Sequence, residues 1–167
     1  MTKTELAYFA GLIDGERCIA VKRNGTKTFR IRSPVYYIYI EVGMCDPRAI
    51  QFFCKAFNTT LRVHQRKNPK WRPCYFTLAV NNKALRIIRL LQPFLITKRE
   101  EANLAIEYHR RCVASFHYHA PGNNRRVIPK KLLALRHSYY LKLRALKVRK
   151  WPIPRLGKYP YGRKESL

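Results

Sequence analysis

The stretch LAYFAGLIDGE at residues 6–16 decides the fold of this chain. Two glycines lie in a run that otherwise predicts a helix, and an interior glycine costs about 1 kcal/mol relative to alanine. Ala7, Gly11 and Gly15 recur every four residues, so they share one helical face. A face of small residues lets a second backbone approach closely. Because Asp14 and Glu16 stand at the end of the run, the pattern predicts a helix pair that brings carboxylates together.

Two strands and a helix are predicted next. Residues 18–24 and 29–44 form strand patterns, with Asn24 and the following glycine as a tight turn. Alternation in the second strand predicts that one set of residues is buried: Tyr36, Ile38, Ile40 and Val42. Asp46 and Pro47 are a typical N-cap and first turn for a helix with one buried stripe.

The second half repeats this order. Residues 61–66 predict a strand with Leu61 and Val63 inward, and residues 75–80 the returning strand. We expect helices capped by Asn82 and by a capping box at residues 97–100, then a last helix opened by Pro129. The order predicts an α+β domain over residues 1–150, with a four-stranded antiparallel sheet and helices on one face. Residues 151–167 form a basic, Pro/Gly-rich tail, either disordered or extended along a partner.

Charge indicates a polyanionic partner. The chain has 35 Lys and Arg against 9 Asp and Glu, a net charge of +26, and residues 47–99 contain no acidic residue. Cationic side chains that neutralise phosphates release condensed counterions, so nucleic acid is the favoured partner. A membrane surface is the weaker alternative, because no separate basic amphipathic helix is predicted. Without a signal-peptide pattern or a long apolar run, we expect a soluble, intracellular protein.

The cysteines and histidines carry a weaker metal pattern. Five cysteines without a CxxC pair indicate reduced thiols rather than a disulfide framework. Four residues could form a zinc site, although their spacing fits no common structural zinc pattern: His109, Cys112, His117 and His119. Buried cysteine and surface histidine is the favoured interpretation.

Residues 10–16 resemble the core signature of the LAGLIDADG homing endonucleases. A second stretch resembles the later segment of single-motif members of this family: residues 91–95, Lys98 and residues 102–104. The resemblance covers roughly residues 4–146 and implies the LAGLIDADG fold, an α-β-β-α-β-β-α order whose sheet forms a DNA-binding saddle. An ordinary helix pair with a glycine at its crossing point would not account for the second match.

The resemblance also implies the chemistry. Glu16 matches the catalytic acid and Gly15 a backbone ligand of Mg²⁺, for which Mn²⁺ can substitute, whereas Ca²⁺ supports binding with little cleavage. Lys98 matches a lysine that organises water or stabilises negative charge, and Arg48 a basic residue beside the water network. Asp14 matches an acid that is generally structural.

One motif supplies one acid, so the resemblance implies a homodimer. Its interface would consist of Ala7, Gly11, Asp14 and Gly15. Twofold symmetry then implies a long pseudopalindromic site in double-stranded DNA, and in this family the cut leaves 3′ overhangs.

Two groups of residues are expected to bind DNA. Side chains on the outer sheet face can read base edges, and other basic side chains can meet phosphates. The first group is Lys22, Asn24, Tyr37, Tyr39, Glu41, Arg62, His64 and Arg66, and the second is Arg30, Arg32, Lys67, Lys70, Arg72 and the basic residues of the last helix. A solvated basic sheet face is the alternative for these positions.

Two departures from the family pattern weaken the catalytic prediction. Arg17 replaces the glycine that normally ends the motif, and Met44 stands where many relatives have a polar residue, whose role Glu41 or Asp46 could take. The main hypothesis is an intron- or intein-type homing endonuclease in an organelle (chloroplast or mitochondrion) or in a bacterial or viral host cell. The alternatives are an RNA maturase that binds intron RNA, a catalytically silent nucleic-acid-binding protein, or a basic ribosomal-type protein.

Overall fold

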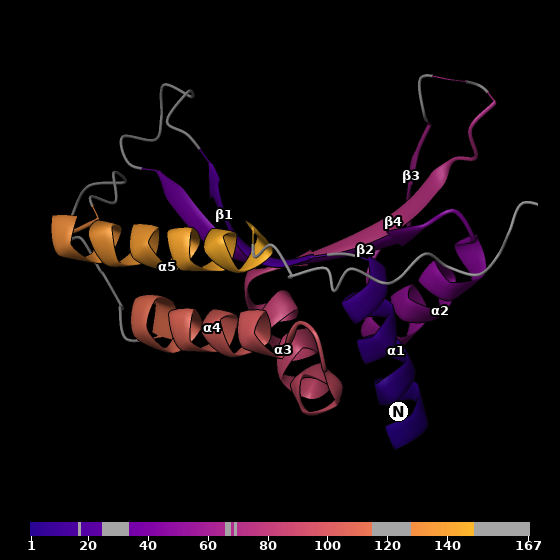
Figure 1. The fold of residues 1–167 in the computed structure, drawn as a ribbon, viewed down its shortest axis with the longest axis horizontal. Helices are drawn as coiled ribbons and strands as arrows, with labels where there is room; N and C mark the ends of the chain where they lie inside the picture. The colour runs from indigo at the N-terminus through magenta and orange to yellow at the C-terminus, as the bar shows by residue number, and fades with distance from the viewer. Residues whose placement is uncertain (17, 25–33, 66–67, 69, 115–127, 149–167) are drawn as a thin grey trace, which may run out of the picture.

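The computed structural model describes residues 1–16, 18–24, 34–65, 68, 70–114 and 128–148, with only the backbone of residues 16 and 148. The elements follow the order expected from the sequence (Figure 1). They are α1 (Lys3–Glu16), β1 (Cys18–Asn24), β2 (Val35–Met44), α2 (Pro47–Phe57), β3 (Arg62–His64), β4 (Cys74–Val80), α3 (Asn81–Leu91), the 3₁₀ turn η1 (Gln92–Phe94), α4 (Arg99–His109), the π-helical turn η2 (Arg110–Ala114) and α5 (Lys130–Val148).

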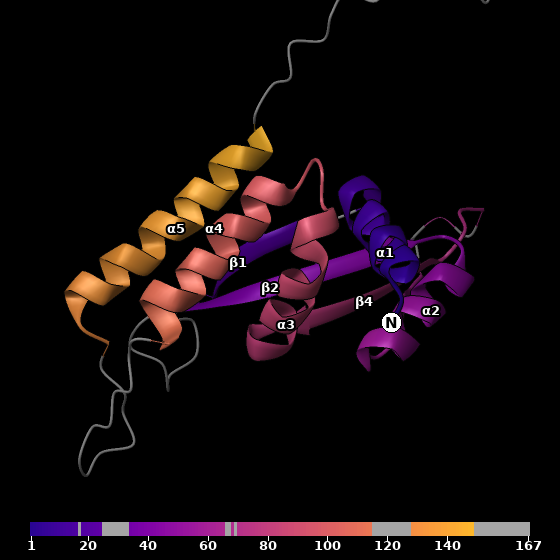
Figure 2. The same cartoon turned by 90° about the horizontal axis from the view of Figure 1, so that it is seen from below.

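The four strands form one antiparallel sheet in the order β1-β2-β4-β3. The sheet is strongly curved, and α1 to α4 lie on its convex side (Figure 1), where α3 crosses below β2 and β4 (Figure 2). Helix α5 runs beside β1 and α4. The α+β architecture with helices on one face is therefore confirmed. No helix in the described ranges combines the length and apolar character that a membrane crossing requires.

The core lies between the convex sheet face and the helices. The alternation predicted for β2 is confirmed, because Tyr36, Ile38, Ile40 and Val42 are all buried. Helices α1, α3, α4 and α5 add further buried side chains, among them Phe9, Ile13, Ile88, Tyr108, Tyr139 and Leu143.

Glycine at position 43 is required by close strand packing. A Cβ built on Gly43 would lie 2.8 Å from the Phe76 Cβ and 3.1 Å from the Tyr75 carbonyl oxygen. Gly43 and Phe76 are register partners in β2 and β4, so the Phe76 side chain occupies the space above the glycine. Met44 faces the opposite side and packs against the core.

Several local predictions are confirmed. The Thr2 backbone N–H donates to Glu5 Oε2 at 2.7 Å and the Glu5 N–H to Thr2 Oγ1 at 3.2 Å, which forms the capping box of α1. Asp46 caps α2 by accepting from the Arg48 N–H at 2.9 Å. Strand β1 has the predicted bounds.

Three local predictions fail in whole or in part. Val63 shares the core-facing side of the sheet with its register partner Tyr75, as predicted, but it is 53% exposed rather than buried. Asn82 does not cap α3, which begins at Asn81 and has no side-chain cap at Val80. No side chain of the segment before α4 caps that helix either, so residues 97–100 form no capping box.

The remaining sequence predictions about loops lie outside the described residues. These are the turn after Asn24, the strand segment 29–33 and the tail at 151–167. All five cysteines are in the described part of the chain, and the structure has each of them as a thiol outside any disulfide.

Candidate active site and nucleic-acid interface

Asp14 connects the end of α1 to the start of α4. Its carboxylate accepts backbone N–H bonds from Ile96 at 2.8 Å, Thr97 at 3.3 Å and Lys98 at 2.9 Å. Partial burial raises the pKa of Asp14, but the N–H donors, those of Ile96 and Lys98 foremost, outweigh burial and hold the pKa below its usual value. A carboxylate at these N–H groups also complements the positive end of the α4 dipole. Asp14 thus supplies the cap that the side chains before α4 do not.

Lys98 forms a second link between the start of α4 and the end of α1. Its ammonium donates to the Ile13 carbonyl at 2.5 Å and to the Asp14 carbonyl at 2.8 Å, which satisfies carbonyl groups in the last turn of α1. Lys98 is half-buried, and burial lowers its pKa although the Asp14 carboxylate opposes that shift. The side chain therefore holds the backbone immediately before Gly15 and Glu16.

The small-residue face of α1 is on the surface. Ala7, Gly11 and Gly15 are exposed, and a Cβ added at either glycine would meet no atom within 4 Å. Within the described part of the protomer, nothing approaches closely enough to explain these glycines. Glu16 ends α1, whereas its side chain and the whole of Arg17 lie outside the described residues.

Arg48 does not join the Asp14–Lys98 contacts. Its Nε and Nη2 atoms bind the Asp46 carboxylate at the start of α2, with an Nη2–Oδ2 distance of 2.6 Å. This bonding lowers the pKa of Asp46 to about 2. The Arg48 side chain is 87% exposed, so it remains accessible to a ligand.

The concave sheet face carries the side chains expected to read bases. Register places Lys22 opposite Tyr37, so these two share a face with Tyr39 and Glu41 of β2. Lys22, Asn24, Arg62 and His64 are exposed, and Tyr37, Tyr39 and Glu41 are partly so. Lys70 and Arg72 are exposed between β3 and β4. Arg30, Arg32, Arg66 and Lys67 lie outside the described residues.

Strand β4 adds an apolar stripe that alternation in the sequence did not assign to a face. Register pairs Phe76 with Gly43, Leu78 with Glu41 and Val80 with Tyr39, so all three β4 side chains lie on the concave face. Val80 is 39% exposed. Apolar side chains on such a face can contact thymine methyl groups in the major groove.

A second group missed in the sequence surrounds Cys18. The Tyr39 hydroxyl donates to the Cys18 Sγ at 3.4 Å, and the Lys147 Nζ also contacts this sulfur. Lys147 comes from the end of α5, 129 positions along the chain, so no local pattern indicates the contact.

The zinc hypothesis receives no support from the described residues. Cys112 is fully buried, and burial lowers the pKa of His109. Among the residues that the structure describes, no three His, Cys, Asp or Glu side chains are grouped to hold a metal ion. His117 and His119 lie outside that set.

No protein-family model and no curated protein matches the sequence. Solved structures match the fold. The homing endonuclease I-CvuI, in complex with the I-CreI target in 2 mM Mg with the DNA not cleaved, is 15% identical with a TM-score of 0.64, over 86% of this chain and 82% of that chain. The archaeal intron-encoded homing endonuclease I-Vdi141I, complexed with DNA, is 14% identical with a TM-score of 0.53, over 83% of this chain and 98% of that one.

A third match is the LAGLIDADG homing endonuclease I-GzeII in complex with a DNA target. It is 13% identical with a TM-score of 0.58, and the match covers 84% of this chain but 43% of that chain. Each of the three matches covers 83% or more of this chain. This chain therefore has the LAGLIDADG homing endonuclease fold.

Proposed function

We propose that the protein is a sequence-specific homing endonuclease that hydrolyses phosphodiester bonds in double-stranded DNA. The observation that carries the proposal is the concave sheet face, which is basic and aromatic and lies opposite α1 to α4 (Figure 1). The solved proteins of the same fold are complexes with DNA targets. A curved, twisted β-ribbon can enter the major groove and present side chains to base edges.

The surface of α1 supports a homodimer. Each interior glycine destabilises a helix by about 1 kcal/mol, and no contact within the described protomer offsets this loss. A second α1 packed on Ala7, Gly11 and Gly15 would use the exposed backbone, since small residues permit close helix approach. Twofold symmetry would then place two copies of Glu16 beside one axis and favour a pseudopalindromic target.

The end of α1 fits a divalent cation. Gly15 is exposed and has open space beside it. A carboxylate from Glu16 and a backbone carbonyl from Gly15 are hard oxygen ligands, which Mg²⁺ and Mn²⁺ accept. When bound, such an ion neutralises charge on the scissile phosphate and lowers the pKa of a bound water. Ca²⁺ should support DNA binding with little cleavage.

Lys98 and Arg48 complete the proposed site. Lys98 fixes the Ile13 and Asp14 carbonyls, so it positions the last turn of α1 and adds positive charge beside it. Arg48 is exposed on α2 and can supply a further cation to the phosphates or their bound water. Two symmetry-related cuts that face each other across the minor groove would leave 3′ overhangs.

The first experiment tests Glu16 with a matched control. Wild-type protein, Glu16→Gln and Glu5→Gln are incubated with a library of random duplexes and Mg²⁺, and cleaved ends are sequenced. We expect Glu16→Gln to bind DNA but to lose at least about 10³-fold in cleavage rate, because a neutral amide is a poor Mg²⁺ ligand. Glu5→Gln should cleave normally, since glutamine also completes a capping box.

The outcomes separate the candidate functions. Cleavage by Glu16→Gln at the wild-type rate would remove Glu16 from its assigned role. Wild-type binding to DNA without cutting in Mg²⁺ or Mn²⁺ would favour the catalytically silent binding protein. Binding to an intron RNA in preference to duplex DNA would favour the maturase.

A further inference from the structure

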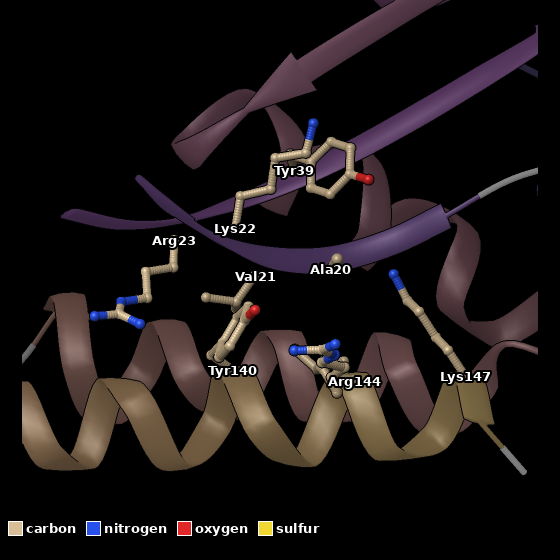
Figure 3. A pocket seen from close by; sticks show the side chains of 9 residues that line it. Ala20, Val21, Lys22, Arg23, Tyr39, Tyr140, Arg144 and Lys147 are labelled. Atoms are coloured by element: carbon tan, nitrogen blue, oxygen red, sulfur yellow. The ribbon is translucent and has the colours of Figure 1, made fainter. Parts of the chain in front are cut away.

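A groove of about 270 Å³ lies between the edge strand β1 and the C-terminal half of α5 (Figure 3). Among the lining residues that the structure describes, four are cationic and none is a carboxylate. The lining consists of Ala20, Val21, Lys22, Arg23, Tyr39, Tyr140, Leu143, Arg144 and Lys147. Strand β1, on one side of the groove, is an edge strand of the sheet.

The cations come from both sides of the groove. Lys22 lies on the concave face with its Nζ 4.1 Å from the centre of the Tyr39 ring, while Arg23 points to the α5 side of β1 (Figure 3). Arg144 and Lys147 are three residues apart, so they project from neighbouring turns of one helical face toward β1. The groove therefore begins at the proposed DNA-binding face and continues along α5.

Like charges around one hollow repel one another. All four cationic side chains are exposed, so water and salt reduce the repulsion without removing it. Elsewhere on the surface, Arg48 and Arg111 form ion pairs with Asp46 and Glu107. A groove whose described lining has four cations and no carboxylate is suited to an anion with regularly spaced charges, and Tyr140 adds a hydroxyl group that can bind a phosphate oxygen.

The groove leads toward the end of α1. Lys147 contacts the sulfur of Cys18, the first residue of β1. Cationic side chains thus continue from Arg23 through Arg144 to Lys147 at the start of β1, the strand that follows the end of α1 in the chain.

We propose that the groove between β1 and α5 binds phosphodiesters of the DNA duplex and directs one sugar–phosphate backbone from the concave sheet face to the end of α1. The inference rests on the proposed function. Its ligand is the DNA backbone rather than the bases, so its contribution should be independent of sequence.

The test compares two double variants with equal loss of charge. Arg144→Gln/Lys147→Gln removes two groove cations, and Arg86→Gln/Arg89→Gln removes two exposed arginines with the same spacing on α3. Binding to a fluorescent random-sequence duplex is measured by anisotropy from 0.05 to 0.4 M salt. Losing two phosphate contacts per protomer should reduce the slope of log K against log [salt] by about 1.8 for each protomer bound, which is about 3.6 for the homodimer. Binding at 0.15 M salt should weaken about 30-fold for each protomer.

The Arg86→Gln/Arg89→Gln variant should keep the wild-type slope of log K against log [salt]. The Arg144→Lys/Lys147→Arg variant, which keeps both positive charges, should also have the wild-type slope. Thermal unfolding followed by circular dichroism identifies any variant that fails to fold. Equal slopes for the two charge-removing variants would overturn the groove proposal and leave the endonuclease proposal intact. Failure of the wild type to bind any duplex would contradict the proposed function itself. Loss of RNA binding alone, with duplex binding unchanged, would also overturn the groove proposal.

Discussion

Asp14 illustrates how far a residue type can be interpreted before its partners are known. The sequence indicates a carboxylate at a helix end, and the family resemblance assigns it a structural role at a dimer interface. The structure shows that the carboxylate accepts N–H bonds from residues 96–98 of its own chain. Those donors are more than 80 positions away, so helical periodicity around residue 14 contains no information about them.

Asp14→Asn is expected to destabilise the protein by about 1 kcal/mol, because both carboxylate oxygens accept backbone N–H bonds and an amide offers only one acceptor oxygen. Because N–H donors hold the pKa of Asp14 below its usual value, the ionised carboxylate stabilises the fold above the unfolded-state pKa of about 3.9, and that stabilisation is lost as pH falls through the folded-state pKa. The free energies of unfolding of the wild type and of Asp14→Asn, measured with urea, should therefore differ at pH 7 and converge as the pH falls below about 4. A difference that grows on acidification would contradict this assignment.

Helices, strands and helix caps were predictable from the sequence where residues close in the chain determine them. Strand β1, the capping box of α1 and the Asp46 cap of α2 follow from alternation and short-range hydrogen bonds. Alternation gives the face of Val63 but not whether a helix covers it. The cap of α4 could not be predicted locally because it comes from α1. In the candidate site, Gly15 and Glu16 remain predictions from the motif, whereas Lys147 beside Cys18 depends on packing between distant elements.

Gly43→Ala tests the packing of β2 against β4. The added Cβ would lie 2.8 Å from the Phe76 Cβ and 3.1 Å from a backbone oxygen, so both strands must shift. We expect a loss of about 1–3 kcal/mol in the free energy of unfolding, typical of overpacked sites. Urea unfolding at fixed protein concentration measures it. A Gly43→Ala protein as stable as the wild type would show that β2 and β4 can move apart without strain.

For the whole molecule, the open face of α1 predicts opposite effects of one substitution. Gly11→Ala has room in the protomer, because no atom lies within 4 Å of the added Cβ, and alanine favours a helix over glycine by about 1 kcal/mol. A second α1 packed there would meet that methyl group. We expect the dimer to dissociate about 10- to 100-fold more readily, the equivalent of a 1–3 kcal/mol steric penalty.

Sedimentation over a concentration series measures the dissociation, with Gln51→Ala, an exposed helical position on α2, as the control. Unchanged association of Gly11→Ala would place the contact between protomers elsewhere. A wild-type protein that stays monomeric, both free and on DNA, would contradict the shared site altogether.

The reciprocal bonds between Asp14 and Lys98 also set an order of events during synthesis. A chain still on the ribosome that has been translated only through β4 carries the motif helix without the donors that fix its end, since those lie 84 positions downstream. Truncated translation products that stop before residue 96 must therefore lack this arrangement. Any property that depends on this arrangement of the last turn of α1 becomes available only once α4 has been made and has docked.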